Sequence, residues 1–420
     1  MFDNLPFKPA NILLPRDCDL SLWSVVACDQ YTSQPEYWQR VEERVGRAPS
    51  ALRLILPESC LEGPGVETDI MEINNTMSRY LREGRFQEYP DALIYVERTL
   101  DSGKVRRGLI GMADLEQYDY EPGSSSSIRA TEGTVMSRIP PRVAVRKNAP
   151  IELPHAMLLV DDPIRSIIEP LSVRTGEMEC LYDFDLMERG GHLRGWLLTQ
   201  ELKDFVFRAL NTRKDRVEKD MDGLLFVTGD GNHSLAAAKE CYERRKGMTD
   251  SSQWPDLPSR WALCEIVNLH DEAVEFEPIH RVVFGIKPEE LLDALMDFYP
   301  SAVRGRGEGH VLSFSINRWG RGEITVTRPE NQLPLATLQD FLDHYIVSHP
   351  RMRIDYIHGA ETAEQLAEER EDALAFLLPP IRKESLFTTV VRDGTLPRKA
   401  FSIGRAHDKR FYLEARKIRK

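Results

Sequence analysis

The sequence lacks the patterns that mark disulfide-stapled, zinc-binding and membrane-spanning proteins. It has six cysteines in 420 residues, and they are scattered, with no CxxC pair and no HExxH motif. No charged segment followed by an apolar stretch opens the chain, and no apolar run approaches the roughly 18 residues of a membrane-spanning helix. We therefore expect a soluble protein of a reducing cytoplasm, with no membrane partner and no structural zinc.

The sequence also lacks an excess of basic residues and two common catalytic signatures. Its 55 basic residues face 67 acidic ones, and the net charge of −12 opposes binding to a polyanion. Nucleic acid is therefore not an expected partner. Neither a GxxxxGK[ST] phosphate loop nor a GxSxG nucleophile turn occurs, which excludes P-loop enzymes and α/β-hydrolases as first choices. The oligomeric state stays open.

What the chain contains is an alternation of apolar strands and amphipathic helices. Strand-like runs at residues 10–15 and 261–268 accompany helical spacing of apolar residues at 35–45 and 70–81. A hairpin is expected around the turn residues 101–103. This mixture predicts an α+β fold, a mixed α/β arrangement of mixed sheets with flanking helices, rather than a uniformly parallel sheet.

The length of the chain, 420 residues, is above the size at which one hydrophobic core usually splits into two. We predict a first lobe over residues 1–285 and a C-terminal α/β lobe over residues 286–420 that completes a cleft. One composite domain is the alternative. The first lobe contains an almost wholly apolar run at 224–228, which predicts a central strand covered on both faces. An alanine-rich helix follows at 234–246.

The turn at residues 229–234 joins that strand to that helix. It brings together groups that could take part in binding or catalysis. Gly229 and Gly231 permit unusual backbone angles and close approach of a ligand, and a helix start attracts phosphate. The alternative is a purely structural turn. Asp-Gly pairs mark turns in many proteins, and an asparagine before a helix is usually only a cap.

Polar side chains in this turn, and one near the start of the chain, are candidates for the chemistry. Asp230 could receive a proton from a hydroxyl or hold a divalent cation, and His233 could donate to a phosphoryl oxygen. Asn232 could cap the helix or bond a ligand. Asp29 lies in the polar link 27–33, where a scaffold can hold functional groups in position, although an Asx-type turn is the simpler interpretation.

The residue order Asp-Gly-Asn-His-Ser at 230–234 resembles the Asp-Gly-His-His-Arg signature of the ParB/sulfiredoxin-like superfamily. That superfamily includes an ADP-dependent free-serine kinase. Over nearly the whole chain, the order of segments resembles the bacterial family known as domain of unknown function 1015. The other segments that carry this likeness are Phe7-Lys8-Pro9, Ala27-Cys28-Asp29-Gln30-Tyr31, Arg138-Ile139-Pro140-Pro141-Arg142, Glu277-Pro278-Ile279-His280-Arg281 and Leu396-Pro397-Arg398-Lys399.

The chain departs from the superfamily signature at two positions. Asn232 stands where the signature has its first histidine, and Ser234 stands where it has arginine. Arginine grips a phosphate bidentately, whereas serine offers one hydroxyl. Another basic residue would have to supply the missing charge. The candidates are Arg129, Arg142, Arg281 and Lys399.

The resemblance implies a nucleotide-dependent phosphotransferase that uses ADP or ATP with Mg2+ and acts on a small hydroxylated molecule. In that scheme Asp230 and His233 sit against the phosphates, Asp230 can also hold the metal, and Asp29 or Glu132 serves as base or cation ligand. The residues implied in cofactor binding are Gly229, Gly231, Asn232, Ser234, Arg129, His280, Arg281 and Lys399. The alternative is a regulatory protein that binds a nucleotide or a phosphorylated metabolite without turnover.

Overall fold

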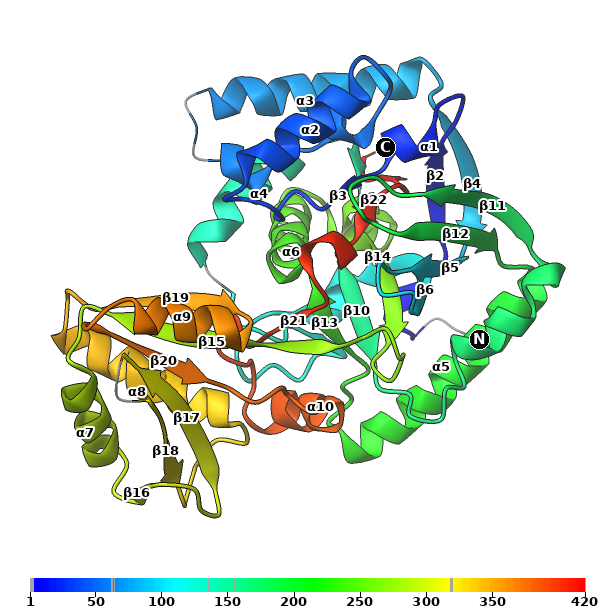
Figure 1. Ribbon diagram of the computed structural model, residues 1–420. Coiled ribbons are helices and arrows are strands. Elements are labelled where there is room, and N and C mark those ends of the chain that lie inside the picture. Colours follow the sequence, from blue (N-terminus) through cyan, green and yellow to red (C-terminus); the bar gives the residue numbers. More distant parts are fainter. Residues whose placement is uncertain are drawn as a thin grey trace. The chain divides into compact units, whose positions relative to one another are not determined.

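The computed structural model describes residues 4–61, 63, 65–134, 136–153, 156–317 and 320–419. Its helices and strands form two compact units, and most of these elements are labelled in Figure 1. The first unit takes Met1–Val274 together with Gly404–Lys420, and the second takes Glu275–Ile403. Each unit has its own large sheet.

These units differ in their limits from the lobes 1–285 and 286–420 that the sequence led us to expect. Strand β15 (Phe276–Phe284) pairs with other strands of the second unit, which therefore begins before residue 286. The last segment of the chain returns to the first unit, where Arg416 lies 2.7 Å from Glu152. Both differences arise from contacts between residues far apart in the sequence, which no local pattern marks.

The first unit contains six α-helices among the described residues. They are α1 (Leu20–Trp23), α2 (Pro35–Val45), α3 (Val66–Arg82), α4 (Ile139–Arg146), α5 (Gln200–Asp220) and α6 (Asn232–Lys246). The strands of its large sheet are β1 (Phe7–Lys8), β5 (Ile94–Thr99), β6 (Val105–Asp114), β7 (Tyr118–Asp119), β8 (Ile128–Arg129), β10 (Met157–Val160), β11 (Glu179–Asp185), β12 (His192–Leu197), β13 (Phe226–Asp230) and β14 (Trp261–Asn268). Short strands pair outside it: β2 (Ala10–Pro15) with β4 (Phe86–Ala92), β3 (Val25–Val26) with β22 (Phe411–Tyr412), and β9 (Ile151–Glu152) with β23 (Arg416–Lys417).

The large sheet of the first unit is mixed. Its strands follow the order β11-β12-β5-β6-β14-β10-β13-β8-β7, and β1 pairs with β6. Strand β10 runs parallel to β14 and antiparallel to β13, while β13 runs parallel to β8. The predicted mixed α/β class is therefore confirmed. Strand β13 lies inside the sheet with Phe226, Val227 and Thr228 buried, as its apolar run predicted.

Hydrophobic cores cover both faces of this sheet. Along β5, Ile94 and Val96 join one core and Tyr95 joins the other, because successive side chains of a strand point to opposite faces. Helices α2 and α3 contribute to the first core, and α5 and α6 contribute to the second. Small side chains let α6 also pack closely against α4, where Ala236 and Ala237 meet the apolar residues of that helix.

The second unit has an antiparallel sheet of its own, in the order β16-β18-β17-β20-β15-β19, with β21 paired to β15. Besides β15, its strands are β16 (Ala302–Arg304), β17 (His310–Ile316), β18 (Gly320–Val326), β19 (Arg353–His358), β20 (Ala373–Leu377) and β21 (Phe401–Ile403). Its helices are α7 (Pro288–Phe298), α8 (Pro334–Ser348), α9 (Ala360–Glu368) and α10 (Lys383–Arg392). Across the described residues of both units, no helix combines the length and the apolar character needed to cross a bilayer.

Buried charges bind the returning C-terminal segment to the large sheet of the first unit. Arg410 places one nitrogen 2.5 Å from Glu265 of β14 and another 2.5 Å from Glu414. The three side chains are almost inaccessible to solvent. Gly108 of the neighbouring β6 leaves room for this pair, since a Cβ there would collide with the carboxylate of Glu265.

Replacing Glu265 by glutamine should destabilise the protein strongly, because the buried guanidinium of Arg410 loses one of its carboxylates. Removing one partner of a buried ion pair costs roughly 3–5 kcal/mol. Chemical denaturation measures the free energy of unfolding. The control is Glu290→Gln. The carboxylate of Glu290 pairs with Lys287 on an exposed helix surface, so this substitution should change the free energy of unfolding by less than about 1 kcal/mol.

The Glu265 pair should also make stability sensitive to acid. Burial alone would raise the pKa of Glu265. The positive charges of Arg410 and then Arg106 outweigh this effect, so the pKa of Glu265 is lowered. A carboxyl of this kind adds stability above its unfolded pKa of about 4.3 and loses that stability as the pH falls through the folded value. The free-energy difference between the native chain and Glu265→Gln should therefore shrink below about pH 4. A constant difference from neutral pH down to about pH 3 would contradict this account.

Candidate functional site

The turn between β13 and α6 is built around a glycine. Gly229 and Asp230 end β13, and Gly231 precedes α6 with a left-handed φ of 79°. The Oδ1 atom of Asp230 accepts the Gly231 N–H at 2.9 Å. A Cβ at Gly231 would lie 2.9 Å from the Cα of Ala156. Glycine is therefore needed here both for its backbone angle and for the close approach of Ala156.

Asn232, the first residue of α6, uses its side chain to lock the turn. Its Oδ1 accepts the hydroxyl of Thr228, and its Nδ2 donates to Thr131 Oγ1 at 3.4 Å. Thr131 in turn donates its hydroxyl to the carbonyl of Thr228 at 2.7 Å. These bonds hold the chain around Thr131 beside the turn and bring the segment of Glu132 to it. His233 and Ser234 lie in the first turn of α6.

A basic residue from the far end of the chain faces Asp230. The Nζ atom of Lys409 lies 3.4 Å from Asp230 Oδ2, and the two side chains are 11% and 19% exposed. Buried Arg98 holds this segment by donating to the carbonyls of Lys409 at 2.5 Å and His407 at 2.6 Å. Burial, and then the charge of Arg106, lower the pKa of Arg98 to about 9, so it remains a cation at neutral pH. The sequence patterns did not mark Lys409.

The same segment reaches the loop that carries Asp29. The backbone N–H of Ala27 donates to the carbonyl of Arg410 at 2.8 Å, and that of Cys28 donates to Tyr412 Oη at 3.2 Å. The Tyr412 hydroxyl donates to Cys28 Sγ at 3.1 Å. Asp29 follows directly in the chain, so the structure brings its loop and the Asp230 turn against one short C-terminal segment.

Cys28 is poorly suited to act as a nucleophile, although it borders the site. Burial, and then the charge of Asp29, raise the pKa of its thiol to about 12. The thiol therefore keeps its proton at neutral pH, and only the thiolate is strongly nucleophilic. The hydroxyl, carboxylate, ammonium and imidazole groups of this region are better suited to chemistry at neutral pH.

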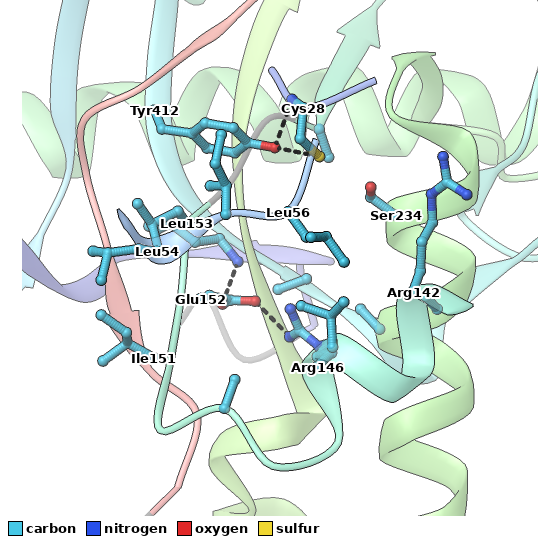
Figure 2. A pocket seen from close by; sticks show the side chains of 18 of the residues that line it. Cys28, Leu54, Leu56, Arg142, Arg146, Ile151, Glu152, Leu153, Ser234 and Tyr412 are labelled. Carbon is cyan, nitrogen blue, oxygen red and sulfur yellow. Dashed lines mark hydrogen bonds and ion pairs between the residues drawn. The ribbon is translucent and has the colours of Figure 1, made fainter. Parts of the chain in front are cut away.

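A pocket with a cavity volume of about 150 Å³ opens beside the first turn of α6. Figure 2 shows Ser234 and Arg142 on one side and Cys28 and Tyr412 on another, with Leu56 between them. Much of the remaining wall is apolar, and includes Leu54, Met77, Val145, Ile151, Leu153 and Leu263. The Nη2 atom of Arg142, one of the predicted phosphate ligands, lies 2.9 Å from a carboxylate oxygen of Glu58. The pocket therefore joins an apolar cavity to a few polar groups near the turn.

The structure does not bring the guanidinium of Arg129 to the turn. Arg129 lies on β8 opposite Val227 of β13. Its guanidinium donates to the carbonyl of Ser126 at 2.9 Å and to the carboxylate of Asp222 at 2.8 Å. Asp222 precedes β13, whereas Asp230 ends it, so the side chain of Arg129 secures the opposite end of the strand.

The remaining predicted residues belong to the second unit, which is described by itself. His280 is buried, and its Nδ1 accepts the Leu378 N–H at 3.1 Å. Arg281 is fully buried and donates to the carbonyl of Arg398 at 3.1 Å. Lys399 is exposed and has a left-handed φ of 55°. Arg281 therefore supports the segment that presents Lys399.

The described residues show no group of three or more His, Cys, Asp or Glu side chains suited to hold a metal ion. Asp230 already faces Lys409 and accepts the Gly231 N–H. Mg2+ commonly takes one or two carboxylates and completes its shell with phosphate and water oxygens. Asp230 could therefore supply one carboxylate to such a shell, and a cation there would compete with Lys409 for it.

Replacing Gly231 by alanine should destabilise the turn, because the new Cβ adds both a strained φ and a clash with Ala156. A non-glycine residue in a sparsely populated backbone region costs of order 1–3 kcal/mol. Thermal unfolding should show a lowered Tm. The control is Gly247→Ala at the other end of α6, where φ is −63° and a Cβ would meet its nearest neighbour at 3.6 Å. Equal effects of the two substitutions would contradict the role of Gly231.

Several solved structures resemble this chain at low sequence identity. A mutant of a free serine kinase in complex with ADP is 11% identical, with a TM-score of 0.41, and the match covers 75% of this chain and 93% of the other. For SbnI with C-terminal truncation from Staphylococcus aureus the identity is 9%, the TM-score 0.36 and the coverage 72% and 82%. A conserved hypothetical protein from Pyrococcus furiosus is 12% identical, with a TM-score of 0.36, and the match covers 72% of this chain and 90% of the other.

The family relationship rests on the sequence of most of the chain. No curated protein matches the sequence of this chain. The model of a family described as protein of unknown function, DUF1015, matches residues 7–349. This match confirms the resemblance read from the order of the segments, and the chain belongs to the DUF1015 family.

Proposed function

We propose that this protein binds a nucleotide and transfers a phosphoryl group to a small hydroxylated molecule. The observation that carries the proposal is the pairing of Asp230 with Lys409, 3.4 Å apart, where α6 begins. Lys409 can neutralise charge on a phosphate, and Asp230 can accept a proton or hold a cation beside it. Such positioning and charge neutralisation supply most of the catalysis in phosphoryl transfer.

The start of α6 supports the same placement of the phosphates. This helix is 15 residues long and has no side-chain cap, and the positive end of a helix dipole favours an anion. Ser234 lacks the charge that the superfamily signature has at its position. Lys409 supplies a positive charge at this turn from another part of the chain.

Further groups around the turn are suited to the other tasks of such a reaction. Asp29 and Glu132 are the candidate bases for the hydroxyl of the acceptor, since the segments of both are bonded to the turn or to the residues around Lys409. Mg2+, when bound, would neutralise charge on the phosphates with Asp230 as its protein ligand. The apolar pocket beside Ser234 suits the ring of a nucleotide or the body of the acceptor.

A second candidate function is binding without turnover. Asn232 replaces the first histidine of the signature, and its amide is engaged by Thr228 and Thr131. That side chain therefore supports the turn. A regulatory protein that holds a nucleotide or phosphorylated metabolite at the same turn would need no more than the remaining groups.

Replacing Asp230 by asparagine should separate the two functions. We expect ADP, ATP or CTP with Mg2+ to raise the Tm of the native chain, and turnover with pooled small alcohols and amino acids to follow. Asp230→Asn should keep the shift but lower turnover about 100-fold or more. Asp215→Asn, at an exposed position of α5, is the control and should behave as the native chain.

The outcomes distinguish the proposals. A nucleotide shift without turnover in the native chain would favour the binding function. No shift with any nucleotide would contradict both. Unchanged turnover in Asp230→Asn would remove Asp230 from the chemistry.

A further inference from the structure

A second pocket of the first unit gathers basic side chains at the C-terminal ends of α4 and α6. Its cavity volume is about 350 Å³, and its basic lining consists of Arg146, Lys147, Arg244, Arg245 and Arg419. Helix α6 has 15 residues and is therefore roughly 20 Å long. The pocket lies at the opposite end of this helix from the Asp230 turn, so it is a separate place on the molecule.

Only part of the positive charge in this pocket is neutralised by neighbouring carboxylates. Arg146 lies 2.5 Å from Glu152, and Arg244 lies 2.8 Å from Glu240. The other basic residues of the pocket make no ion pair with a carboxylate elsewhere in the described part of the chain; they are Lys147, Arg245 and Arg419. The whole protein has a net charge of −12, so this excess of cations is a local property of the pocket.

The ends of two helices do not by themselves explain the pocket. Basic residues in the last turn of a helix interact favourably with its negative end, which accounts for Arg146 and for Arg244 and Arg245 separately. Arg419 comes from the C-terminal segment and from neither helix. Arg419 donates to Asn148 Oδ1 at 3.3 Å and to the carbonyl of Lys147. A separate part of the chain therefore adds a guanidinium to the same cavity.

Two neutral residues of the pocket support this description. The hydroxyl of Ser259 is buried and has no hydrogen-bond partner among the described residues. Burial raises the pKa of Cys241, and the charges of Arg146, Arg244 and Arg419 act in the opposite direction. The charges of these three guanidinium groups therefore act on Cys241, which lines the same pocket as Ser259.

We propose that this basic pocket binds a small anion with more than one phosphate group. Guanidinium groups match phosphate oxygens with paired N–H donors, and an ammonium group adds a compact positive charge. A concave lining drawn from four segments suits a small ligand that is contacted from several sides. Lys147, Arg244, Arg245 and Arg419 do not line the pocket beside Ser234, whereas Arg146 lines both pockets.

The test uses the full chain and pyrophosphate as the probe, in isothermal titration calorimetry at constant ionic strength maintained with sodium chloride. We expect saturable binding with one pyrophosphate per pocket. The double substitution Lys147→Ala with Arg245→Ala removes two exposed cations and should weaken binding about tenfold or more. The matched control is Arg208→Ala with Arg216→Ala, which removes two arginines from a different groove on α5.

A third variant, Lys409→Ala, separates this pocket from the Asp230 turn. The proposal expects it to leave most pyrophosphate binding in place. Circular dichroism and Tm confirm that each variant is folded. The proposal is overturned by absence of saturable binding, by equal weakening in the Arg208 and Arg216 control, or by loss of binding in Lys409→Ala alone. Tighter binding of polyglutamate that competes with pyrophosphate would also overturn it, in favour of an acidic protein partner.

Discussion

The candidate site depends on the buried ion pairs that return the C-terminal segment to the first unit. Arg410 sits between Glu265 and Glu414, out of contact with solvent. Charges so placed are tolerated only when their partners are close and well aligned, so the pairs fix the register of the segment. Lys409, one residue before Arg410, is thereby set against Asp230, and Tyr412, two residues after it, meets Cys28.

The two ends of α6 receive positive charge from this same segment. At its start, Lys409 faces Asp230. At its end, Arg419 joins the basic residues of α4 and α6. The small side chains of α6 allow close packing against α4 and the sheet, so both ends of the helix are held in a rigid frame. The two ends of the helix differ because the fold brings a carboxylate to the turn at its start and several basic side chains to the pocket at its end.

Local patterns predicted much of the secondary structure and the central turn. The helix expected at residues 35–45 is α2, the apolar run at 224–228 leads into buried β13, and the turn at Gly229–Ser234 joins β13 to α6 as expected. The sequence predicted the placement of individual side chains less well. Arg129 is tied to Asp222 at the far end of β13, and Asn232 is engaged by two threonines, because hydrogen-bond partners distant in sequence decide where a polar side chain points.

The sequence by itself determined the mixed α/β class, the DUF1015 relationship and the position of the Asp-Gly turn, because hydrophobic periodicity, turn residues and the order of motifs are local properties. Only the tertiary structure decided the limits of the two units, the pairing of Lys409 with Asp230 and the basic pocket completed by Arg419. These features join residues separated by more than a hundred positions. Buried charge pairing and strand register select such contacts, and both depend on the whole folded chain.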